Sequence, residues 1–331
     1  MSKRQWNSGL RRWGMVLGLV GALGLLSGCG RKDGVDAGPR GTAENPWVFG
    51  FSQCTLNEPW RVEMNRQVQL AAEKYPEVKL LMANAEDKSE RQVNDVENFL
   101  AQGVDLIIIS PKEAAPLTDI VAKAYKQGTP VVVLDRKVLG EDYSCFIGAN
   151  NQKIGYQAGL KVKALLAEGG KVVELTGNMS STPGEERQRG FREAIAEELA
   201  SGKIEILHDA DCDWKEERAR SEMEAALAAN ERIDLVYGHN DPMAHGAWLA
   251  ASQQDRAEGI HFVGIDGLPN EGVSYVREGI LTATFEYPTG GAEAIDAGLA
   301  LMKGEPVEKV ITLGTRIYTK ENVSAGGEAI D

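Results

Sequence analysis

The residues Pro130-Val131-Val132-Val133-Leu134-Asp135-Arg136 give the clearest indication of the fold of this chain. Four consecutive apolar residues with no polar residue between them are typical of a strand that is buried on both faces. Such strands belong to parallel sheets that helices cover on both sides. Asp135 and Arg136 follow the strand directly, so they would lie at the carboxyl edge of the sheet, where α/β folds bind their ligands.

Strands of the same kind recur along the chain and alternate with amphipathic helical segments. The pattern predicts strands at 47–52, 78–83, 105–110, 130–135 and 144–149, with helices at 61–75, 89–101 and 116–127. A second round begins with a helix at 152–167 and continues with strands at 171–176, 203–208, 234–238, 261–265 and 281–285. Two rounds of this winding predict an α/β fold of two lobes, each a parallel sheet flanked by helices, with a cleft between them.

The N-terminus has the pattern of a cleaved signal sequence. It opens with four basic residues, Lys3, Arg4, Arg11 and Arg12. The apolar stretch 13–26 that follows has 14 residues, too few to span a membrane as a helix. The tetrapeptide Leu26-Ser27-Gly28-Cys29 resembles the lipobox of bacterial lipoproteins, in which the cysteine becomes the lipidated first residue. We therefore predict a signal peptide at 1–28 and lipidation of Cys29; an uncleaved anchor and ordinary secretion are the alternatives.

The composition indicates a large acidic domain. Hydrophobic residues make up 43% of the 331, which is enough for the cores of two lobes. Loss of residues 1–28 removes four positive charges and no negative ones, so the net charge changes from −13 to −17. A surface this acidic repels phosphate backbones, and we expect no nucleic-acid partner. No second apolar run is long enough for a membrane helix, so we expect membrane contact through the lipid anchor only.

Two further features of the sequence concern the tether and the cysteines. Residues 29–45 are rich in glycine and charge, and we predict that they form a flexible tether between the lipid and the domain. Cys54, Cys145 and Cys212 remain after Cys29. An odd number of thiols cannot all pair, so we expect at most one disulfide.

Polar residues directly follow several of the predicted strands: Ser110-Pro111, Asp135-Arg136, Asn240-Asp241-Pro242 and Asp266-Gly267. A carboxylate beside a guanidinium offers two acceptor oxygens and five donors, and such a pair can satisfy several sugar hydroxyls at once. In the third group we predict that Asp241 caps a helix whose first turn contains Pro242. Asn240 would then be freer to meet a ligand.

At these positions the chain resembles the ribose-type periplasmic sugar-binding proteins of ABC transporters, and within them most closely the galactofuranose-binding branch. The resemblance extends from about 47 to 318 and rests on the order and spacing of six motifs: Thr55-Leu56-Asn57-Glu58-Pro59-Trp60-Arg61, Ala101-Gln102-Gly103-Val104-Asp105, Leu134-Asp135-Arg136, Gly190-Phe191, Gly238-His239-Asn240-Asp241 and Gly264-Ile265-Asp266-Gly267. It implies a first lobe at 46–149 with 288–313 and a second lobe at 150–287 with 314–324, joined by three crossings.

The resemblance also implies which residues bind the ligand: Trp60, Arg61, Asp135, Arg136, Arg187, Trp214, Asn240, Asp266 and Tyr287. Tryptophan rings offer apolar faces to the C–H groups of a sugar, while Asp, Asn and Arg bond its hydroxyls. The ribose binders have an asparagine where Glu58 stands and an aromatic residue where Arg61 stands. The Trp60-Arg61 pair matches the galactofuranose branch instead, which argues against a pentopyranose and makes a furanose hexose one candidate.

Most of these residues also have an explanation that involves no ligand. Asp135 and Arg136 could form a surface ion pair, which contributes little to stability. Trp60 and Trp214 could each pack at the start of a helix. Arg187 could pair with Glu185 or Glu186, and Asp266-Gly267 could form a simple turn.

The resemblance and the signal sequence together lead us to expect a lipid-anchored solute-binding subunit of an ABC importer. It would capture a monosaccharide by lobe closure and deliver it to a permease and ATPase complex, in the periplasm or on the outer face of the cytoplasmic membrane, with the outer membrane as a further option for the anchor. A sugar sensor that docks on a chemoreceptor or kinase is one alternative, and a sugar-modifying enzyme is another.

Known enzyme and cofactor motifs are missing from the sequence. It contains no nucleophile elbow, no P-loop and no dinucleotide-binding glycine turn. Its four histidines do not have the spacing of metal ligands. We therefore expect no enzymatic activity, no cofactor and no metal, and we expect the protein to be a monomer.

Replacing Cys29 with serine tests the lipobox. We expect Cys29→Ser to abolish lipid attachment while the domain still folds, because position 29 lies at the start of the predicted tether, before the domain. Metabolic labelling with a radioactive or clickable fatty acid measures the attachment, and Cys54→Ser serves as the control that keeps its label. Equal label in Cys29→Ser and the parent protein would contradict the prediction.

Overall fold

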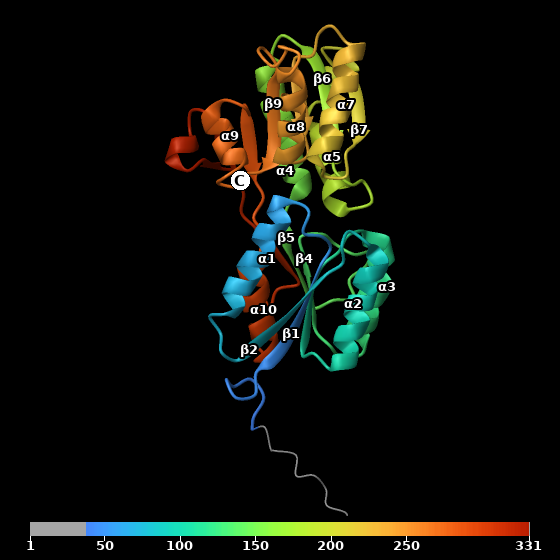
Figure 1. Cartoon of the computed structure of the whole chain (residues 1–331), viewed down its shortest axis with the longest axis vertical. Coiled ribbons are helices and arrows are strands. Elements are labelled where there is room, and N and C mark those ends of the chain that lie inside the picture. The colour runs from blue at the N-terminus through green and yellow to red at the C-terminus, as the bar shows by residue number, and fades with distance from the viewer. Residues whose placement is uncertain (1–37, 331) are drawn as a thin grey trace, which may run out of the picture. The chain divides into compact units, whose positions relative to one another are not determined.

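The computed structural model describes residues 38–330. The predicted signal peptide, Cys29 and residues 29–37 of the predicted tether lie outside this range. Within it, the strands form two separate sheets, and helices cover both faces of each (Figure 1). The fold is therefore the two-lobed α/β arrangement that the sequence predicts.

The first lobe is built on a parallel sheet with the strand order β11-β5-β4-β3-β1-β2. Its strands are β1 (Trp47–Gln53), β2 (Val78–Asn84), β3 (Leu106–Ser110), β4 (Val131–Leu134), β5 (Cys145–Ala149) and β11 (Val310–Leu313). One face is covered by α1 (Pro59–Ala72) and α10 (Gly291–Met302), and the other by α2 (Ser89–Gln102) and α3 (Ala114–Lys126) (Figure 1). Every residue of β3, β4 and β5 is buried, as expected for strands that helices cover on both faces.

The second lobe has the strand order β13-β12-β10-β9-β8-β6-β7. Its strands are β6 (Gly170–Thr176), β7 (Ile204–Asp211), β8 (Leu235–Gly238), β9 (His261–Asp266), β10 (Ala283–Glu286), β12 (Arg316–Thr319) and β13 (Glu328–Ala329). The helices are α4 (Asn151–Leu165), α5 (Thr182–Ala194), α6 (Ala196–Ala200), α7 (Glu216–Ala229), α8 (Asp241–Ser252) and α9 (Gly272–Glu278), with a 3-10 turn at Val323–Ala325. Helices α4 and α5 pack together, as do α7 and α8.

The ten predicted strands all occur, and each end lies within three residues of its predicted position. Strands β11, β12 and β13 were not predicted. They are short and lie at or near sheet edges, and β11 alternates exposed with half-buried residues rather than forming an apolar run. Strands β12 and β13 run antiparallel to their neighbours, so the second sheet is parallel only in its main part.

The chain crosses between the lobes three times. The crossings are the connections from β5 to α4, from β10 to α10 and from β11 to β12. The lobe boundaries that the resemblance implies fall in these connections, and their positions at single residues stay a prediction. The second crossing carries Tyr287, and residues of this short segment therefore lie next to both lobes.

Residues 38–45, the last part of the predicted tether, contact the first lobe. The Arg40 guanidinium donates to both carboxylate oxygens of Asp105 at 3.1 and 2.5 Å, and Asn45 Nδ2 donates to the carbonyl of Gly38 at 2.9 Å. These bonds hold the segment in a series of bends directly before β1. This part of the chain is thus attached to the first lobe by these hydrogen bonds, and the tether stays a prediction.

The cysteines of the described part of the chain form no disulfide. Cys54, Cys145 and Cys212 are each buried with a free thiol. Burial raises the pKa of Cys145 to about 11 and that of Cys212 to about 12, so both thiols stay protonated at neutral pH. Among residues 38–330, no helix combines the length and the apolar character needed to cross a membrane.

Candidate functional site

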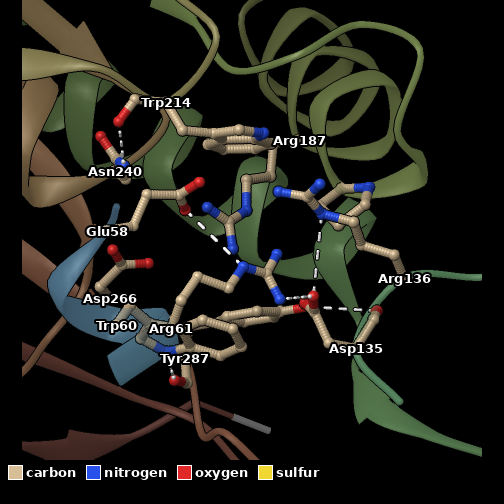
Figure 2. Close-up of a pocket in the computed structure, with 11 residues that line it drawn as sticks. Glu58, Trp60, Arg61, Asp135, Arg136, Arg187, Trp214, Asn240, Asp266 and Tyr287 are labelled. Carbon is tan, nitrogen blue, oxygen red and sulfur yellow. Dashed lines mark hydrogen bonds and ion pairs between the residues drawn. The ribbon is translucent and has the colours of Figure 1, made fainter. Parts of the chain in front are cut away.

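All nine predicted ligand-binding residues line one cavity between the lobes. Seven segments supply them: the starts of α1 and α8, the loops after β4 and β7, the end of β9, helix α5 and the second crossing. The cavity is narrow, with about 20 Å³ of space in which the centre of a water molecule fits. Its lining is Glu58, Trp60, Arg61, Asp135, Arg136, Pro183, Arg187, Trp214, Asn240, Asp266 and Tyr287 (Figure 2).

Aromatic rings form two opposite walls of the cavity. Trp60 and Tyr287 stack with their centroids 5.1 Å apart, and the indole of Trp60 donates to the carbonyl oxygen of Tyr287 at 2.7 Å. The Trp214 ring lies across the cavity from them (Figure 2). Gly177 makes room for that ring, because a Cβ at position 177 would overlap it. The cavity is thus bounded by flat apolar faces on two sides.

A buried ion pair joins α1 to the end of β4. Arg61 Nη1 donates to Asp135 Oδ2 at 2.7 Å and to the hydroxyl of Ser110 at 2.8 Å. The hydroxyl of Tyr287 donates to Asp135 Oδ1 at 2.7 Å. Burial opposes both charges, but their attraction outweighs it: the pKa of Asp135 is lowered and that of Arg61 is raised. Asp135 is 2% exposed, so the alternative of a surface ion pair does not apply.

Two further guanidiniums lie between the aromatic walls. Arg136 is 5.5 Å and Arg187 is 5.4 Å from the centroid of the Trp214 ring, and Arg187 also lies 4.4 Å from that of Tyr287. Arg136 Nη1 donates to the carbonyl oxygen of Lys112 at 2.9 Å. Each guanidinium is therefore held by its aromatic neighbours and by uncharged acceptors, and Arg136 Nε also lies 3.8 Å from Asp135 Oδ2.

Arg187 does not pair with Glu185 or Glu186 in the described structure. Its Nε donates to Asn151 Oδ1 at 2.9 Å, and its Nη1 donates to the carbonyl oxygen of His239. Glu186 instead pairs with Lys137 of the first lobe at 3.1 Å. The side chain of Arg187 points into the cavity rather than along the surface of α5 (Figure 2).

The start of α8 differs from its prediction. Asn240, not Asp241, caps this helix: Asn240 Oδ1 accepts from the backbone N–H of Met243 at 2.9 Å. Asn240 Nδ2 donates to the carbonyl oxygen of Trp214 at 3.1 Å, so its amide also fixes one aromatic wall. Asp241 is fully buried and its carboxylate bonds elsewhere in the lobe. Asn240 lines the cavity, but both ends of its amide already have protein partners.

Two carboxyl groups in the cavity hold their protons more tightly than usual. Burial raises the pKa of Asp266 well above its ordinary value, and nearby Asp241 and Glu58 add to the effect while Arg187 opposes it. Burial also raises the pKa of Glu58, against the charges of Arg61 and Arg136. Among residues 38–330, neither carboxyl group has a protein side chain within hydrogen-bonding distance, and Glu58 lies 3.7 Å from Arg61 Nε. Both are acceptors that hydroxyl groups of a ligand would satisfy.

Several donors at the cavity are also without partners in the described structure. They are Arg61 Nε, Arg136 Nε and Trp214 Nε1, and all three are buried. A buried donor with no acceptor costs about 1–3 kcal/mol. The cavity thus combines apolar walls with donors and acceptors that the protein itself does not satisfy, which is the pattern of a small-molecule site.

Glu58 and Pro183 line the cavity but were not predicted to bind a ligand. Glu58 comes two residues before Trp60 in the same motif, and this proximity was the signal that could have identified it. Pro183 is in the first turn of α5, one helical turn before Arg187, and its sequence context indicates only a helix start. In the part of the chain that the structure describes, no cluster of side chains has the arrangement of a metal site.

A ring of four charges connects the two lobes. We call it the charged ring: Asp87 and Lys112 from the first lobe, and Asp213 and Lys215 from the second. The Nζ of Lys112 lies 2.5 Å from Asp87 Oδ1 and 3.2 Å from Asp213 Oδ1. The Nζ of Lys215 lies 2.7 Å from Asp213 Oδ2 and 3.4 Å from Asp87 Oδ2. Each lobe therefore presents one positive and one negative charge to the other.

Comparison with known proteins gives the following similarities. Residues 49–306 match the family described as periplasmic binding protein domain. The ribose import binding protein of Bacillus subtilis is 27% identical over 91% of this chain and 96% of its own length. The galactofuranose-binding protein of Escherichia coli is 31% identical over 68% of this chain and 72% of its own length.

Two solved structures add to these relatives. The fructose-binding periplasmic domain of a hybrid two-component system is 37% identical, with a TM-score of 0.81, and the match covers 84% of this chain and 92% of that one. The binding protein of an arabinose ABC transporter from a Shewanella species, bound to α- and β-L-arabinofuranose, is 27% identical with a TM-score of 0.78, covering 84% of this chain and 93% of that one.

The charged ring leads to a prediction about lobe separation and pH. Burial alone would raise the pKa of Asp213, but hydrogen bonds from Lys215 and Asn178 and the charge of Lys112 lower it to about 2. A lowered pKa means that the carboxylate stabilises the fold above its ordinary pKa of 3.8 and that this stabilisation is lost as the pH falls towards 2. We expect Asp213→Asn to lower the free energy of unfolding by about 1 kcal/mol at pH 7 and by less near pH 3.

Small-angle scattering should also show a larger radius of gyration for Asp213→Asn, because the cross-lobe contact between Asp213 and Lys112 is lost. Asp142→Asn is the matched control, since Asp142 pairs with Lys126 at 2.7 Å within one lobe. An equal radius of gyration for the two variants would show that the ring does not hold the lobes together.

Proposed function

This chain belongs to the periplasmic binding protein family, and we propose that it is the lipid-anchored solute-binding subunit of an ABC importer for a monosaccharide. Its ligand would be a furanose, captured when the two lobes close on it. The relatives named above bind sugars, and the one from Bacillus subtilis is an import binding protein. In this role the protein binds and releases its sugar without changing it.

The lining of the cavity is the observation that carries the proposal. The stacked Trp60 and Tyr287 rings on one side and the Trp214 ring on the other suit the two faces of a sugar ring (Figure 2). Between them lie the unsatisfied groups of the cavity, namely three N–H donors and the carboxyl groups of Glu58 and Asp266. A sugar hydroxyl both donates and accepts, so several hydroxyls of one monosaccharide could satisfy these groups together.

Arg61 is the residue that favours a furanose. It occupies a position where ribose binders carry an aromatic residue, and with its Nε unsatisfied it offers the ligand a donor where those proteins offer an apolar face. The relatives point the same way, since one binds galactofuranose and another was solved with arabinofuranose. We therefore expect the exocyclic hydroxyls of a furanose hexose or ketohexose to meet Arg61.

Closure follows from the division of the site between the lobes. Trp60, Arg61 and Asp135 belong to the first lobe, whereas Arg187 and Trp214 belong to the second. A ligand that bonds both walls gains most when they are close together, and so it shifts the equilibrium towards the closed state. The charged ring would favour the same state. A permease would then recognise the closed protein. In this proposal the boundaries between the lobes lie at residues 149/150, 287/288 and 313/314.

Sensing is the second candidate function. The fructose-binding domain with 37% identity is part of a hybrid two-component system, in which sugar binding is a signal. The lipobox at Leu26–Cys29 favours transport, because an anchored lipoprotein can reach a permease but is not continuous with a kinase. We place the protein in the periplasm or on the outer face of the cytoplasmic membrane, and neighbouring genes for a permease and an ATPase would support import.

A sugar screen tests the function directly. We expect one furanose-forming sugar among a panel of pentoses, hexoses and ketohexoses to raise the melting temperature, since a ligand at about 100 times its Kd adds about 2.7 kcal/mol. Trp214→Ala should remove this shift. Trp248→Ala is the matched control, because Trp248 stacks on His245 and does not line the cavity. The same sugar at saturation should lower the radius of gyration in small-angle scattering, and an unchanged radius would rule out closure.

Arg61→Phe tests the preference for a furanose. We expect it to weaken binding of a furanose hexose by about 2 kcal/mol or more and to weaken ribose binding less, because a phenyl ring replaces a charged donor with an apolar face. Isothermal titration calorimetry with both sugars gives the ranking. Arg66→Phe, on the exposed side of the same helix, is the control. A sugar ranking that Arg61→Phe leaves unchanged would contradict the furanose assignment but not sugar binding.

A further inference from the structure

Asp241 has an unusual position for a residue at the start of a helix. It directly follows the cap Asn240, yet it is fully buried rather than turned towards the free backbone N–H groups of the helix. It does not line the cavity. A buried carboxylate is costly unless hydrogen bonds or opposite charges compensate it, so the partners of the Asp241 carboxylate matter.

The Asp241 carboxylate links three segments of the second lobe. Oδ2 accepts from the backbone N–H of Gly267 at 2.8 Å, directly after β9. Oδ1 accepts from the hydroxyl of Thr284 in β10 at 2.6 Å. The start of α8, the end of β9 and the middle of β10 are thus joined at one side chain.

Two glycines leave the space that this carboxylate occupies. A Cβ at Gly264, in β9, would overlap Asp241 Oδ1, and a Cβ at Gly272, at the start of α9, would overlap Oδ2. Neither glycine has a positive φ in the structure, so backbone conformation does not require glycine at these positions. Their lack of a side chain therefore serves the close approach of Asp241.

The segment that Asp241 holds is the one that presents Asp266 to the cavity. Asp266 has φ 132°, a conformation that costs a residue with a side chain about 1–3 kcal/mol. Its carbonyl oxygen accepts from the backbone N–H of Tyr287 at 3.0 Å, and the next N–H in the chain, that of Gly267, donates to Asp241. These two bonds hold the backbone on the carboxyl side of Asp266 and thereby the direction of its side chain.

We propose that Asp241 is a positioning residue for sugar binding, whose bond to the Gly267 N–H keeps the carboxylate of Asp266 directed at the ligand. The proposal rests on the proposed function, because it assigns Asp266 to a sugar hydroxyl. Asp241 itself touches no ligand. It also fixes the N-terminus of α8, so that Asn240 and the Trp214 wall keep their places relative to Asp266.

The two carboxyl groups also influence each other electrostatically. Burial raises the pKa of Asp241 to about 7, and the presence of Asp241 helps to raise the pKa of Asp266. The other titratable or charged groups that act on the pair come from α1, α5, α9 and the loop before α9: Glu58, Arg187, Tyr275 and Glu271. Removing the charge at position 241 should therefore lower the pKa of Asp266, which a purely structural role would not require.

Two variants of Asp241 separate position from charge. Asp241→Ala loses both hydrogen bonds, and we expect it to weaken sugar binding by about 10-fold or more. Asp241→Asn can still accept from the Gly267 N–H through its oxygen and donate to the Thr284 hydroxyl, so it should recover most of that affinity. Thr284→Val is the matched control, because it removes the other bond of the same carboxylate and spares the one to Gly267. It should lower stability more than affinity.

The pH profile of binding supplies the second readout. Sugar affinity of the parent protein should fall on acidification as Asp266 takes up a proton and ceases to accept two hydroxyls. In Asp241→Asn the midpoint of this fall should lie at lower pH than in the parent. Calorimetric titrations across the pH range, with the best sugar of the panel, measure the midpoint in the full-length protein.

Hydrogen–deuterium exchange tests the positioning without any sugar. The amide of Gly267 should exchange faster in Asp241→Ala than in the parent, and in Thr284→Val it should stay protected. If Asp241→Ala does not fold, Gly272→Ala takes its place, since the added Cβ would push the carboxylate away from Gly267. Unchanged affinity in the variant that loses the Gly267 bond would overturn the proposal. If the parent protein binds no sugar of the panel, the proposed function fails, whereas the exchange result still decides whether Asp241 holds Gly267.

Discussion

The buried ion pair between Arg61 and Asp135 is the interaction on which the site depends. It joins the start of α1 to the end of β4, and Asp135 in turn accepts from the Tyr287 hydroxyl in the second crossing. Tyr287 stacks on Trp60, so one carboxylate orders a guanidinium and an aromatic wall together. Loss of either partner would leave a buried charge without its nearest opposite charge, and breaking a buried pair in this way commonly costs about 3–5 kcal/mol. The second lobe is tied to the same network, because Tyr287 directly follows β10 of that lobe.

Much of the fold and of the site was predictable from local sequence patterns. Apolar runs such as Val131–Leu134 identify buried parallel strands, and polar residues directly after such strands identify the edge where ligands bind. The strand-end pattern indicated Asp135, Arg136, Asn240 and Asp266, and the family resemblance supplied the other five of the nine residues that line the cavity. The strands that this reasoning missed, β11 to β13, have no apolar run. They pair with strands far away in the sequence, and only the completed sheets determine that pairing.

The assignment of Asn240 and Asp241 shows what local patterns do not contain. Both residues are good helix caps, and the sequence near them does not decide between them. What makes Asn240 the cap is the space at Gly264 and Gly272, where the Asp241 carboxylate is buried. These glycines follow Asp241 by more than 20 residues in the sequence. Glu58 was missed for a related reason: the sequence shows only that it precedes a helix, whereas the structure places it, largely buried, beside Arg61 in the cavity lining.

The return of the chain to its first lobe has a consequence for how the protein is made. Helix α10 and strand β11 belong to the first lobe, but they are synthesised after nearly all of the second. Until residues 291–302 arrive, the face of the first sheet next to α1 lacks one of its two covering helices, and the edge of β5 is unpaired. A growing chain therefore has no complete lobe until this C-terminal part has been made. Completion of both lobes is thus a late step that needs contacts between distant parts of the sequence.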